Sequence, residues 1–168
     1  TPFAVKTETE ERETETVIVA SGASAIWLGL PSEQRLIGRG VSSCAVCDAP
    51  FFKDKNIIVV GGGDTAMREA AHLSKFAKKV TVVHRRDQLR AQSALVELVK
   101  SKKNVDFVWN STIDEILGQD KVVGVRLKDT QSGEIRQLEI DGVFIAIGHK
   151  PNTDFLKGQL DLDEKGYV

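Results

Sequence analysis

The sequence predicts an α/β fold in three layers, with a parallel β-sheet covered by helices and a β-meander in place of one helical crossover. Residues 55–109 alternate β-branched apolar runs with segments of helical periodicity, the pattern of parallel strands joined by helices. Residues 112–141 instead contain short strand-like segments separated by turn sequences, the pattern of a meander. The chain has 168 residues, of which 41% are hydrophobic, so it can bury a core of ordinary size.

The N-terminal part of the chain is expected to be extended or irregular. Residues 7–16 read TETEERETET, and this alternation of acidic residues with β-branched threonines suits an exposed strand or hairpin as well as disorder. We favour a strand. A short apolar run follows at residues 16–20. Residues 21–41 contain four glycines and a proline without a sustained period, which predicts an irregular connector.

The segment from residue 55 to residue 109 predicts two helices between three strands. Ile57–Val60 and Val80–Val83 are β-branched runs suited to buried parallel strands, joined by a right-handed crossover. Between them, apolar residues recur at helical spacing, namely Ala66, Ala70, Leu73 and Ala77. Residues 86–103 predict the second helix and residues 105–109 the third strand.

The remaining segments predict the meander and a last strand. Residues 112–117, 122–129 and 135–141 are short strand-like runs. The sequences GQDK and TQSGE, which lie between them, have the composition of hairpin turns. Residues 142–148, GVFIAIG, are apolar and are expected to form a further strand.

The composition argues against several classes of partner. The formal net charge is −1, so no global charge attracts nucleic acid or an anionic membrane. No apolar run approaches the roughly 18–20 residues that cross a bilayer, and the acidic N-terminal sequence is unlike a signal peptide. We therefore expect a cytoplasmic protein, in a compartment where thiols are usually kept reduced.

The strongest local motif is GGGDTA at residues 61–66, which closes one predicted strand and opens a helix. It fits the pattern G-x-G-x-x-A, in which Gly61 permits a tight turn, Gly63 lets a pyrophosphate approach the backbone and Ala66 lets helix and strand pack closely. The helix N-terminus presents free N–H groups to the phosphates. The interpretation is a dinucleotide site, and the alternative is a tight turn without a ligand. The predicted binding residues are Gly61, Gly62, Gly63, Asp64, Thr65 and Ala66.

Basic residues follow the second predicted strand, at the position that distinguishes NAD from NADP. An NAD site usually has an acidic residue there, which accepts from the ribose 2′-OH. This chain has His84, Arg85 and Arg86, and Arg90 is expected on the same face of the following helix as Arg86. Guanidinium groups suit phosphate geometry, whereas a merely solvated basic patch is disfavoured at a helix N-terminus. The cluster therefore predicts NADP.

The two cysteines, Cys44 and Cys47, form a Cys-x-x-Cys pair followed by Asp48. A structural zinc site needs four ligands, and the three histidines are poorly distributed to complete one. An inert pair is another alternative. The favoured interpretation is a dithiol–disulfide couple, because this spacing lets the sulfurs bond and commonly lowers a thiol pKa. Asp48 could then exchange protons during thiol chemistry, or it could simply be a turn residue.

Beyond single motifs, the chain resembles the low-molecular-weight thioredoxin reductases. Matching blocks follow in the same order and spacing along nearly the whole chain, namely VIVASGASAIWLGLPSE, GRGVSSCAVCDAPFF, VVGGGDTAM, VTVVHRRDQLRA, WNSTIDEI and FIAIGHKPNTDFL. The resemblance implies a Rossmann-like NAD(P)-binding domain of the two-dinucleotide-binding-domain flavoprotein type. It also implies a homodimeric enzyme that passes electrons from NADPH through FAD to a dithiol and then to thioredoxin.

The resemblance assigns roles to the residues already singled out. Cys44 would exchange with thioredoxin, Cys47 would lie next to the flavin and Asp48 would be the acid–base group. The glycine motif and the basic cluster would hold NADPH, and Ile147, Gly148 and His149 would lie near the domain joint.

The resemblance also implies a domain organisation. Residues 1–24 would belong to an FAD domain and a joining strand, residues 25–145 to the NADPH domain with the Cys-x-x-Cys pair, and residues 146–168 to a return segment. Hinges would lie near Gly22 and Gly148.

The family's FAD fingerprint and its later Gly-Asp flavin motif have no counterpart in this sequence. We therefore expect an internal piece of the enzyme that binds NADPH but does not bind FAD or turn over alone. Two alternatives are an isolated nucleotide-binding module without turnover and a flavoprotein subunit of the alkyl hydroperoxide reductase type. The second shares the Cys-x-x-Cys arrangement but prefers NADH, so the basic cluster argues against it.

Overall fold

The computed structural model describes residues 2–168, which form two compact units. The larger unit is Ala25–His149. The smaller unit combines residues 2–24 with Lys150–Val168, and Thr1, with which the predicted 1–24 segment begins, lies outside the described residues.

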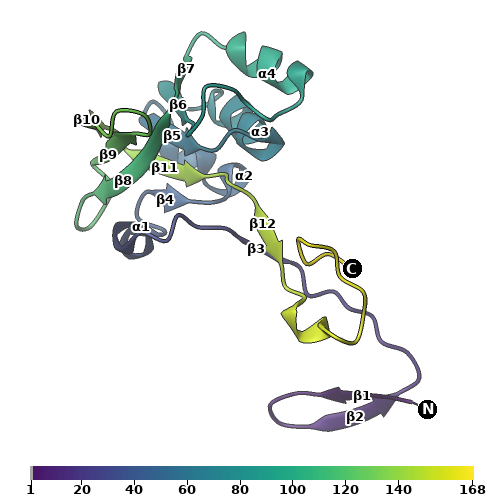
Figure 1. Cartoon of the computed structure of the whole chain (residues 1–168). Coiled ribbons are helices and arrows are strands. Elements are labelled where there is room, and N and C mark those ends of the chain that lie inside the picture. The colour runs from purple at the N-terminus through teal and green to yellow at the C-terminus, as the bar shows by residue number, and fades with distance from the viewer. Residues whose placement is uncertain (1) are drawn as a thin grey trace. The chain divides into compact units, whose positions relative to one another are not determined.

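The larger unit is built on a five-stranded sheet in which neighbouring strands are parallel (Figure 1). The strand order is β4 (Val41–Ser42), β11 (Gly142–Ile145), β5 (Asn56–Val60), β6 (Lys79–Val83) and β7 (Val105–Val108). The register places Val60 opposite both Ile145 and Val83, so the carboxyl ends of β11, β5 and β6 reach one edge. Loops that follow these strands therefore meet at that edge.

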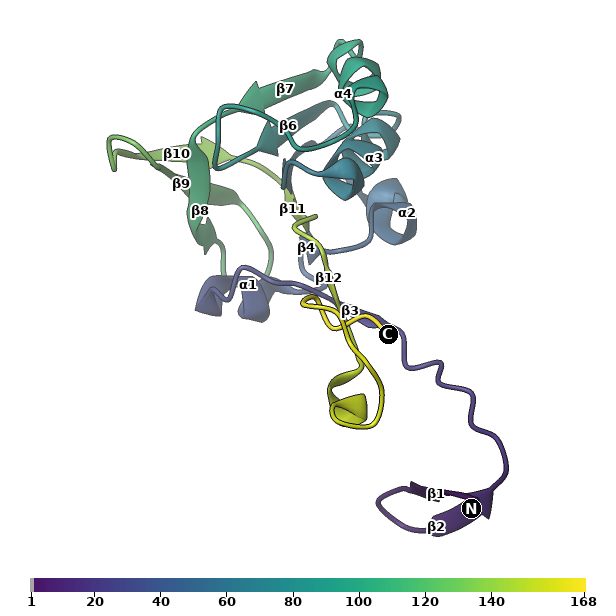
Figure 2. The same ribbon diagram turned by 45° about the vertical axis from the view of Figure 1, so that its right-hand side comes forward.

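The parallel sheet lies between two layers, with helices on one side and the antiparallel meander on the other (Figure 2). Alternate residues of β5 face these two layers. Ile57 and Val59 pack in a core shared with the helices α2 (Ala45–Asp48), η1 (Ala49–Phe52), α3 (Asp64–Leu73) and α4 (Ser93–Lys100). Ile58 and Val60 pack in a second core with α1 (Pro31–Leu36) and the meander. The predicted three-layer α/β fold is confirmed, and burial on both faces explains the unbroken β-branched run.

The meander is a separate antiparallel sheet with the order β10, β9, β8. Its strands are β8 (Ser111–Leu117), β9 (Gly124–Asp129) and β10 (Ile135–Glu139). It connects β7 to β11, where a helix would otherwise make the crossover. This replacement of a helical crossover was predicted and is confirmed.

The two helices of the nucleotide-binding half are shorter than the sequence suggested. α3 ends at Leu73. Ala77 lies beyond this end but is still buried, and its amide donates to the Leu73 carbonyl at 2.9 Å. α4 begins only at Ser93, so the prediction of a helix over residues 86–103 is wrong for its first turns. Residues 86–92 form a loop instead.

The prediction of an irregular connector over residues 21–41 is also wrong in part. The segment contains β3 (Ala23–Ala25), α1 and the first residue of β4. Buried polar side chains hold α1 in place: the Glu33 carboxylate, which is fully buried, accepts from the amides of Leu28 and Gly29 at 2.8 and 2.9 Å. The hydroxyl of Ser32 accepts from the Ile116 amide of the meander at 3.1 Å.

The smaller unit begins with the predicted hairpin. β1 (Phe3–Lys6) pairs antiparallel with β2 (Glu11–Thr14), whereas residues 16–20 carry no regular element. β12 (His149–Pro151) pairs with β3, and η2 (Asp154–Leu156) follows. Of the helices in residues 2–168, none combines the length and the hydrophobicity that a membrane crossing requires.

Candidate functional site

The glycine turn after β5 needs glycine at its first position for two reasons. Gly61 has a φ of +149°, a conformation that side chains with a Cβ rarely adopt. A Cβ there would also clash with the carbonyl oxygen of Ala146 and lie 2.9 Å from the Cβ of Ala66. Gly61 therefore lets the chain turn tightly between β5, β11 and α3, as predicted from the motif.

The other two glycines differ in what surrounds them. A Cβ on Gly62 would overlap the imidazole ring of His84, so the ring packs directly on the turn. A Cβ on Gly63 would meet nothing within 4 Å, so this glycine leaves open space above the backbone. Gly63 also precedes α3, and its carbonyl accepts the Met67 amide at 3.2 Å. Open space beside free helix N-terminal amides is what a bound phosphate requires.

The remaining motif residues have distinct positions. Thr65 lines a cleft at the carboxyl edge of the sheet, whereas Ala66 is fully buried beneath the turn. The carboxylate of Asp64 accepts from the Gln92 amide at 2.8 Å, so it holds the following loop. Asp64 does not line the cleft.

The basic residues after β6 lie on the loop of residues 84–92. The Arg90 amide donates to the Gly62 carbonyl at 2.7 Å, which ties this loop to the glycine turn. Arg85 and Arg90 line the cleft, whereas Arg86 does not. The prediction that Arg86 and Arg90 share a helix face is wrong, because both residues precede α4.

His84 is buried, with 5% of its surface exposed, and it differs from the arginines in its charge state. Burial lowers its pKa, the Gln88 backbone partly opposes this, and the nearby charges of Arg90, Arg85 and Arg86 lower the pKa further. Its Nε2 is buried and has no hydrogen-bond partner within residues 2–168. The lowered pKa favours the uncharged form of His84, whose ring packs on Gly62 and lines the same cleft, while the arginines carry the positive charge.

A cleft of about 460 Å³ lies at the carboxyl edge of the sheet, over the glycine turn. Its floor is the three glycines, and its sides come from β6, the meander and the residues after β11. Residues that the sequence reasoning missed also line it, namely Leu28, Leu30, Val60, Val83, Ser111, Thr112, Ile113 and Ala146. Ile147 and Gly148 line it as well, but His149 does not. The missed residues come from segments far apart in the sequence and carry no motif.

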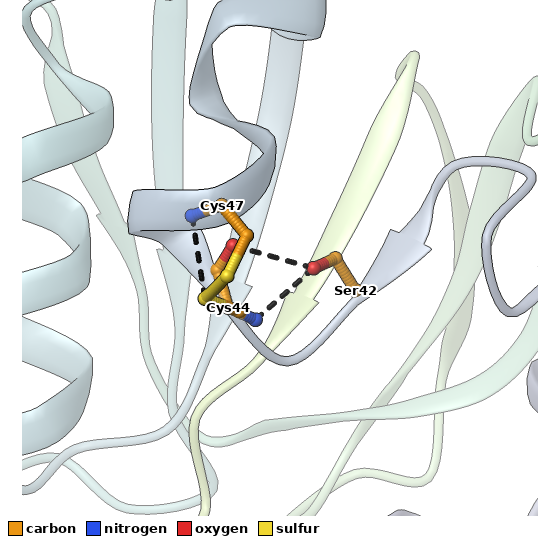
Figure 3. The surroundings of a disulfide bond; sticks show 3 residues. All are labelled: Ser42, Cys44 and Cys47. Carbon is orange, nitrogen blue, oxygen red and sulfur yellow. Dashed lines mark hydrogen bonds between the residues drawn. A yellow bond between two sulfur atoms is a disulfide. The ribbon is translucent and has the colours of Figure 1, made fainter.

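Cys44 and Cys47 are joined by a disulfide, with Cα atoms 5.4 Å apart (Figure 3). Cys44 is the N-cap of α2, and its Sγ accepts from the Cys47 amide at 3.3 Å. The hydroxyl of Ser42, which the sequence reasoning did not single out, accepts from the Cys44 amide at 3.0 Å. Asp48 ends α2, and its amide donates to the Cys44 carbonyl at 3.2 Å.

The disulfide and the cleft belong to the same compact unit but are separate sites. Cys44, Cys47 and Asp48 do not line the cleft. The two sites are connected through α2 and α3, because Ala45 and Ala49 share a core with Ala66 and Ala70. Within residues 2–168, no cluster of three or more His, Cys, Asp or Glu side chains is placed to hold a metal.

The cleft combines two features that are suited to an anionic ligand. Gly63 offers open space beside the N-terminus of α3, and two exposed arginines line the same cleft. Both features bind anions through different means, the first through backbone amides and the second through guanidinium groups.

Comparisons with known proteins agree with these features. The pyridine nucleotide-disulphide oxidoreductase family matches residues 3–168. A thioredoxin reductase of Streptomyces clavuligerus is 52% identical over 168 residues, covering 98% of this chain and 52% of that protein. One from Mycolicibacterium smegmatis is 48% identical over 159 residues, covering 95% of this chain and 51% of that protein. The chain thus spans about half the length of the curated relatives it matches.

Solved structures show the same similarity. Thioredoxin reductase of Lactococcus lactis superposes with a TM-score of 0.89 at 38% identity, over 98% of this chain and 55% of that one. The Streptococcus pyogenes enzyme gives a TM-score of 0.87 at 46% identity, over 98% and 54% of the respective chains. The resemblance and the Rossmann-like fold class predicted from the sequence are confirmed. The chain belongs to the pyridine nucleotide-disulphide oxidoreductase family.

Proposed function

We propose that the chain is the NADPH-binding and dithiol-bearing part of an NADPH-dependent thioredoxin-disulfide reductase. The observation that most supports this is the presence, in one compact unit, of an arginine-lined glycine cleft and a Cys-x-x-Cys disulfide. In this proposal residues 25–145 are the nucleotide domain, and residues 1–24 and 146–168 belong to a flavin domain. The names of the relatives point the same way.

In the cleft, the chain binds and orients NADPH. The glycine turn and the N-terminus of α3 take the pyrophosphate, and Arg85 and Arg90 take the 2′-phosphate, since both line the cleft. His84 supports the turn from below, because its ring packs on Gly62. Arg86, Asp64 and His149 lie outside the cleft, so their contribution is to position the loops around it.

At the disulfide, the chain holds sulfur and moves protons. The hydrogen bond from the Cys47 amide favours negative charge on Cys44, while Asp48 follows on the same turn and is the proposed acid–base group. NADPH supplies a hydride, and FAD is the proposed cofactor that converts it into two-electron reduction of the disulfide. Cys47 is exposed and Cys44 is half-buried.

The proposal extends to partners and location. Thioredoxin, or a thioredoxin-like protein, is the proposed disulfide substrate, and the whole enzyme is proposed to be a homodimer. A cytoplasmic location is proposed as well, because the reaction generates a dithiol that persists best in a reducing compartment.

The nucleotide part is tested by titrating the chain with NADPH and NADH while following the fluorescence of its tryptophans. We expect NADPH to bind about tenfold to 100-fold more tightly, because two arginines read the extra phosphate. Arg85→Ala combined with Arg90→Ala should remove most of this preference, because both residues line the cleft. Arg86→Ala is the control and should have a smaller effect than Arg85→Ala, because Arg86 does not line the cleft. Equal affinities of the unaltered chain would reject NADPH as the cofactor.

The dithiol part is tested without flavin or nucleotide. The chain is reduced with dithiothreitol, freed of the reductant and mixed with an oxidised thioredoxin. We expect one disulfide of thioredoxin to be reduced for each Cys44–Cys47 pair oxidised, measured by alkylation and mass spectrometry. A chain that reduces glutathione disulfide but not thioredoxin would contradict the proposed partner.

A further inference from the structure

Glu69 of α3 is a carboxylic acid in an apolar setting that the proposed function does not use. It directly precedes Ala70 on α3, and both Ala66 and Ala70 are fully buried in a core that they share with Ala45 of α2. Its Oε2 atom is buried and has no hydrogen-bond partner in the described chain. Burial raises the pKa of Glu69 to about 7. A carboxyl group that is half protonated near neutral pH can exchange a proton with its surroundings.

The one group that favours the ionised form of Glu69 links it to the cysteines. Ala45 of α2 packs in the same core as Ala66 and Ala70 of α3, and its backbone amide lowers the pKa of Glu69, though by less than burial raises it. Ala45 directly follows Cys44 and is 2% exposed. Because Ala45 is covalently joined to Cys44 and α2 packs against α3, the Glu69 carboxyl and the Cys44 sulfur lie in the same part of the molecule.

Other charged groups near α3 do not account for the behaviour of Glu69. Titratable side chains on α3 and on the elements that pack against it are Asp64, Arg68, His72, Asp48, Lys79, Glu97 and Lys100. None of these appears among the causes that shift the pKa of Glu69, which are burial and the Ala45 amide. A new charge on Cys44 would therefore be the dominant electrostatic change that Glu69 experiences.

Reduction of the disulfide creates such a charge. The Cys47 amide donates to the Cys44 Sγ at 3.3 Å, and a hydrogen bond to sulfur favours the thiolate. A thiolate on Cys44 and an ionised Glu69 would then be two negative charges at close range. Like charges this close disfavour double ionisation, so the pair keeps one proton.

We propose that Glu69 takes up a proton when the Cys44–Cys47 disulfide is reduced and releases it when the disulfide forms again. The S–S bond breaks, two electrons enter, the Cys47 sulfur binds one proton, the Glu69 carboxylate binds a second, and Cys44 remains a thiolate. The electron donor is the reduced flavin in the proposed reaction, or a small dithiol in the tests below. The inference rests on the proposed function of the two cysteines as a redox couple, and Glu69 is a positioning residue because it acts through the Ala45 amide.

The first test measures the thiol titration of Cys44 in a Cys47→Ser background, where it is the only cysteine. The alkylation rate with iodoacetamide is followed from about pH 5 to pH 10, with and without Glu69→Gln. Glutamine keeps the size of the side chain and an acceptor for the Ala45 amide but cannot ionise. We expect Glu69→Gln to move the profile to lower pH and to raise the rate near pH 8 roughly threefold, because the competing negative charge is gone. The limiting rate at high pH should not change.

The second test counts protons in the chain with both cysteines. The disulfide is equilibrated with dithiothreitol buffers between about pH 6.5 and pH 8.5, and the oxidised fraction is measured after acid quenching and alkylation. We expect Glu69→Gln to take up about half a proton fewer on reduction near pH 7.5. Glu97→Gln, which removes an exposed carboxylate from α4, is the matched control and should behave like the parent.

Superimposable profiles of the parent and Glu69→Gln overturn the inference, as does an equal shift in Glu97→Gln. A change in limiting rate without a change in midpoint would show a packing role and would also overturn it. Because neither test uses NADPH, FAD or thioredoxin, the inference can fail while the proposed function stands. If thioredoxin reduction fails while the proton count depends on Glu69, the proposed partner is wrong and the inference stands.

Discussion

β4 and β5 lie in the same parallel sheet with β11 between them, and each leads at its carboxyl end toward a helix. After β5, a glycine turn opens into the ten-residue α3, and the proposed nucleotide site is formed mainly by backbone groups. β4 ends at Ser42, Ser43 leads to Cys44 and the four-residue α2, and the proposed redox site is formed by two side chains. An anion site needs free amides at the end of a sustained helix, whereas a dithiol needs only one turn that brings two sulfurs together.

The largest expected effect separates the chemistry of the two junctions. Cys44→Ser should abolish thiol transfer to thioredoxin, by about 10³-fold or more, because the proposed nucleophile is gone. NADPH affinity should stay within about twofold of the parent, since Cys44 does not line the cleft. Transfer is measured by alkylation and affinity by tryptophan fluorescence. A loss of both thiol transfer and NADPH binding in Cys44→Ser would show that the two strand–helix junctions are not independent.

The next prediction compares glycines of one turn. Gly61→Ala should destabilise the fold by about 2–3 kcal/mol, because a positive φ and a clash with the Ala146 carbonyl combine there. Gly63→Ala has open space, so its stability should change by less than about 1 kcal/mol while NADPH binding weakens. Urea unfolding measures the first effect and titration the second. Equal destabilisation by the two variants would contradict the assignment of Gly63 to the ligand side.

A smaller effect is expected from Glu69, at the contact between α2 and α3. The folded protein raises its pKa from 4.5 to about 7, so between these values the folded state binds more protons than the unfolded chain. Stability therefore falls as pH rises through this window and stays lower above it. Glu69→Gln should remove this loss and gain about 1 kcal/mol near pH 8, after allowance for the partly exposed side chain. The test is to measure the unfolding free energies of the parent and of Glu69→Gln at one pH below this window and at one pH above it. An equal gain in stability at both pH values would contradict the prediction.

The smallest predicted effect concerns His84, under the glycine turn. Its pKa is lowered mainly by burial, so just below pH 6.5 the folded state binds fewer protons than the unfolded chain. Stability is therefore complete above that pH and falls as the pH decreases toward the folded-state pKa. His84→Gln should flatten this decline, whereas His149→Gln, at an exposed position, should not. If the stability of His84→Gln decreases with falling pH as steeply as that of the parent, groups other than His84 cause the loss of stability at low pH.

Residues 55–83 show how much of the fold local sequence can predict. The runs that became β5, α3 and β6 have periodicity, glycines and β-branched residues that all favour the same structure. β4 could not be recognised in this way, because two residues form a strand only when β11 is beside them. α1 was missed because it has only six residues and is held by buried polar groups, including Ser32, which accepts from the Ile116 amide 84 residues away in the sequence.

The candidate site divides in the same manner. Glycine spacing and the Cys-x-x-Cys pair were visible in the sequence because each is a local requirement of the backbone or of a short covalent link. The loop of residues 86–92 was predicted as helix because its composition permits one. Contacts of Arg90 with Gly62 and of Gln92 with Asp64 hold it open instead. Tertiary hydrogen bonds thus decided which arginines reach the cleft.

The sequence by itself determined the α/β class, the meander, the glycine turn and the spacing of the thiol pair, because neighbouring residues suffice to specify each of them. Only the tertiary structure decided that His84 is buried with a lowered pKa, that Arg86 lies outside the cleft and that Glu69 has a buried carboxyl oxygen and a raised pKa. Charge state and access depend on what surrounds a side chain, and those surroundings come from segments distant along the chain.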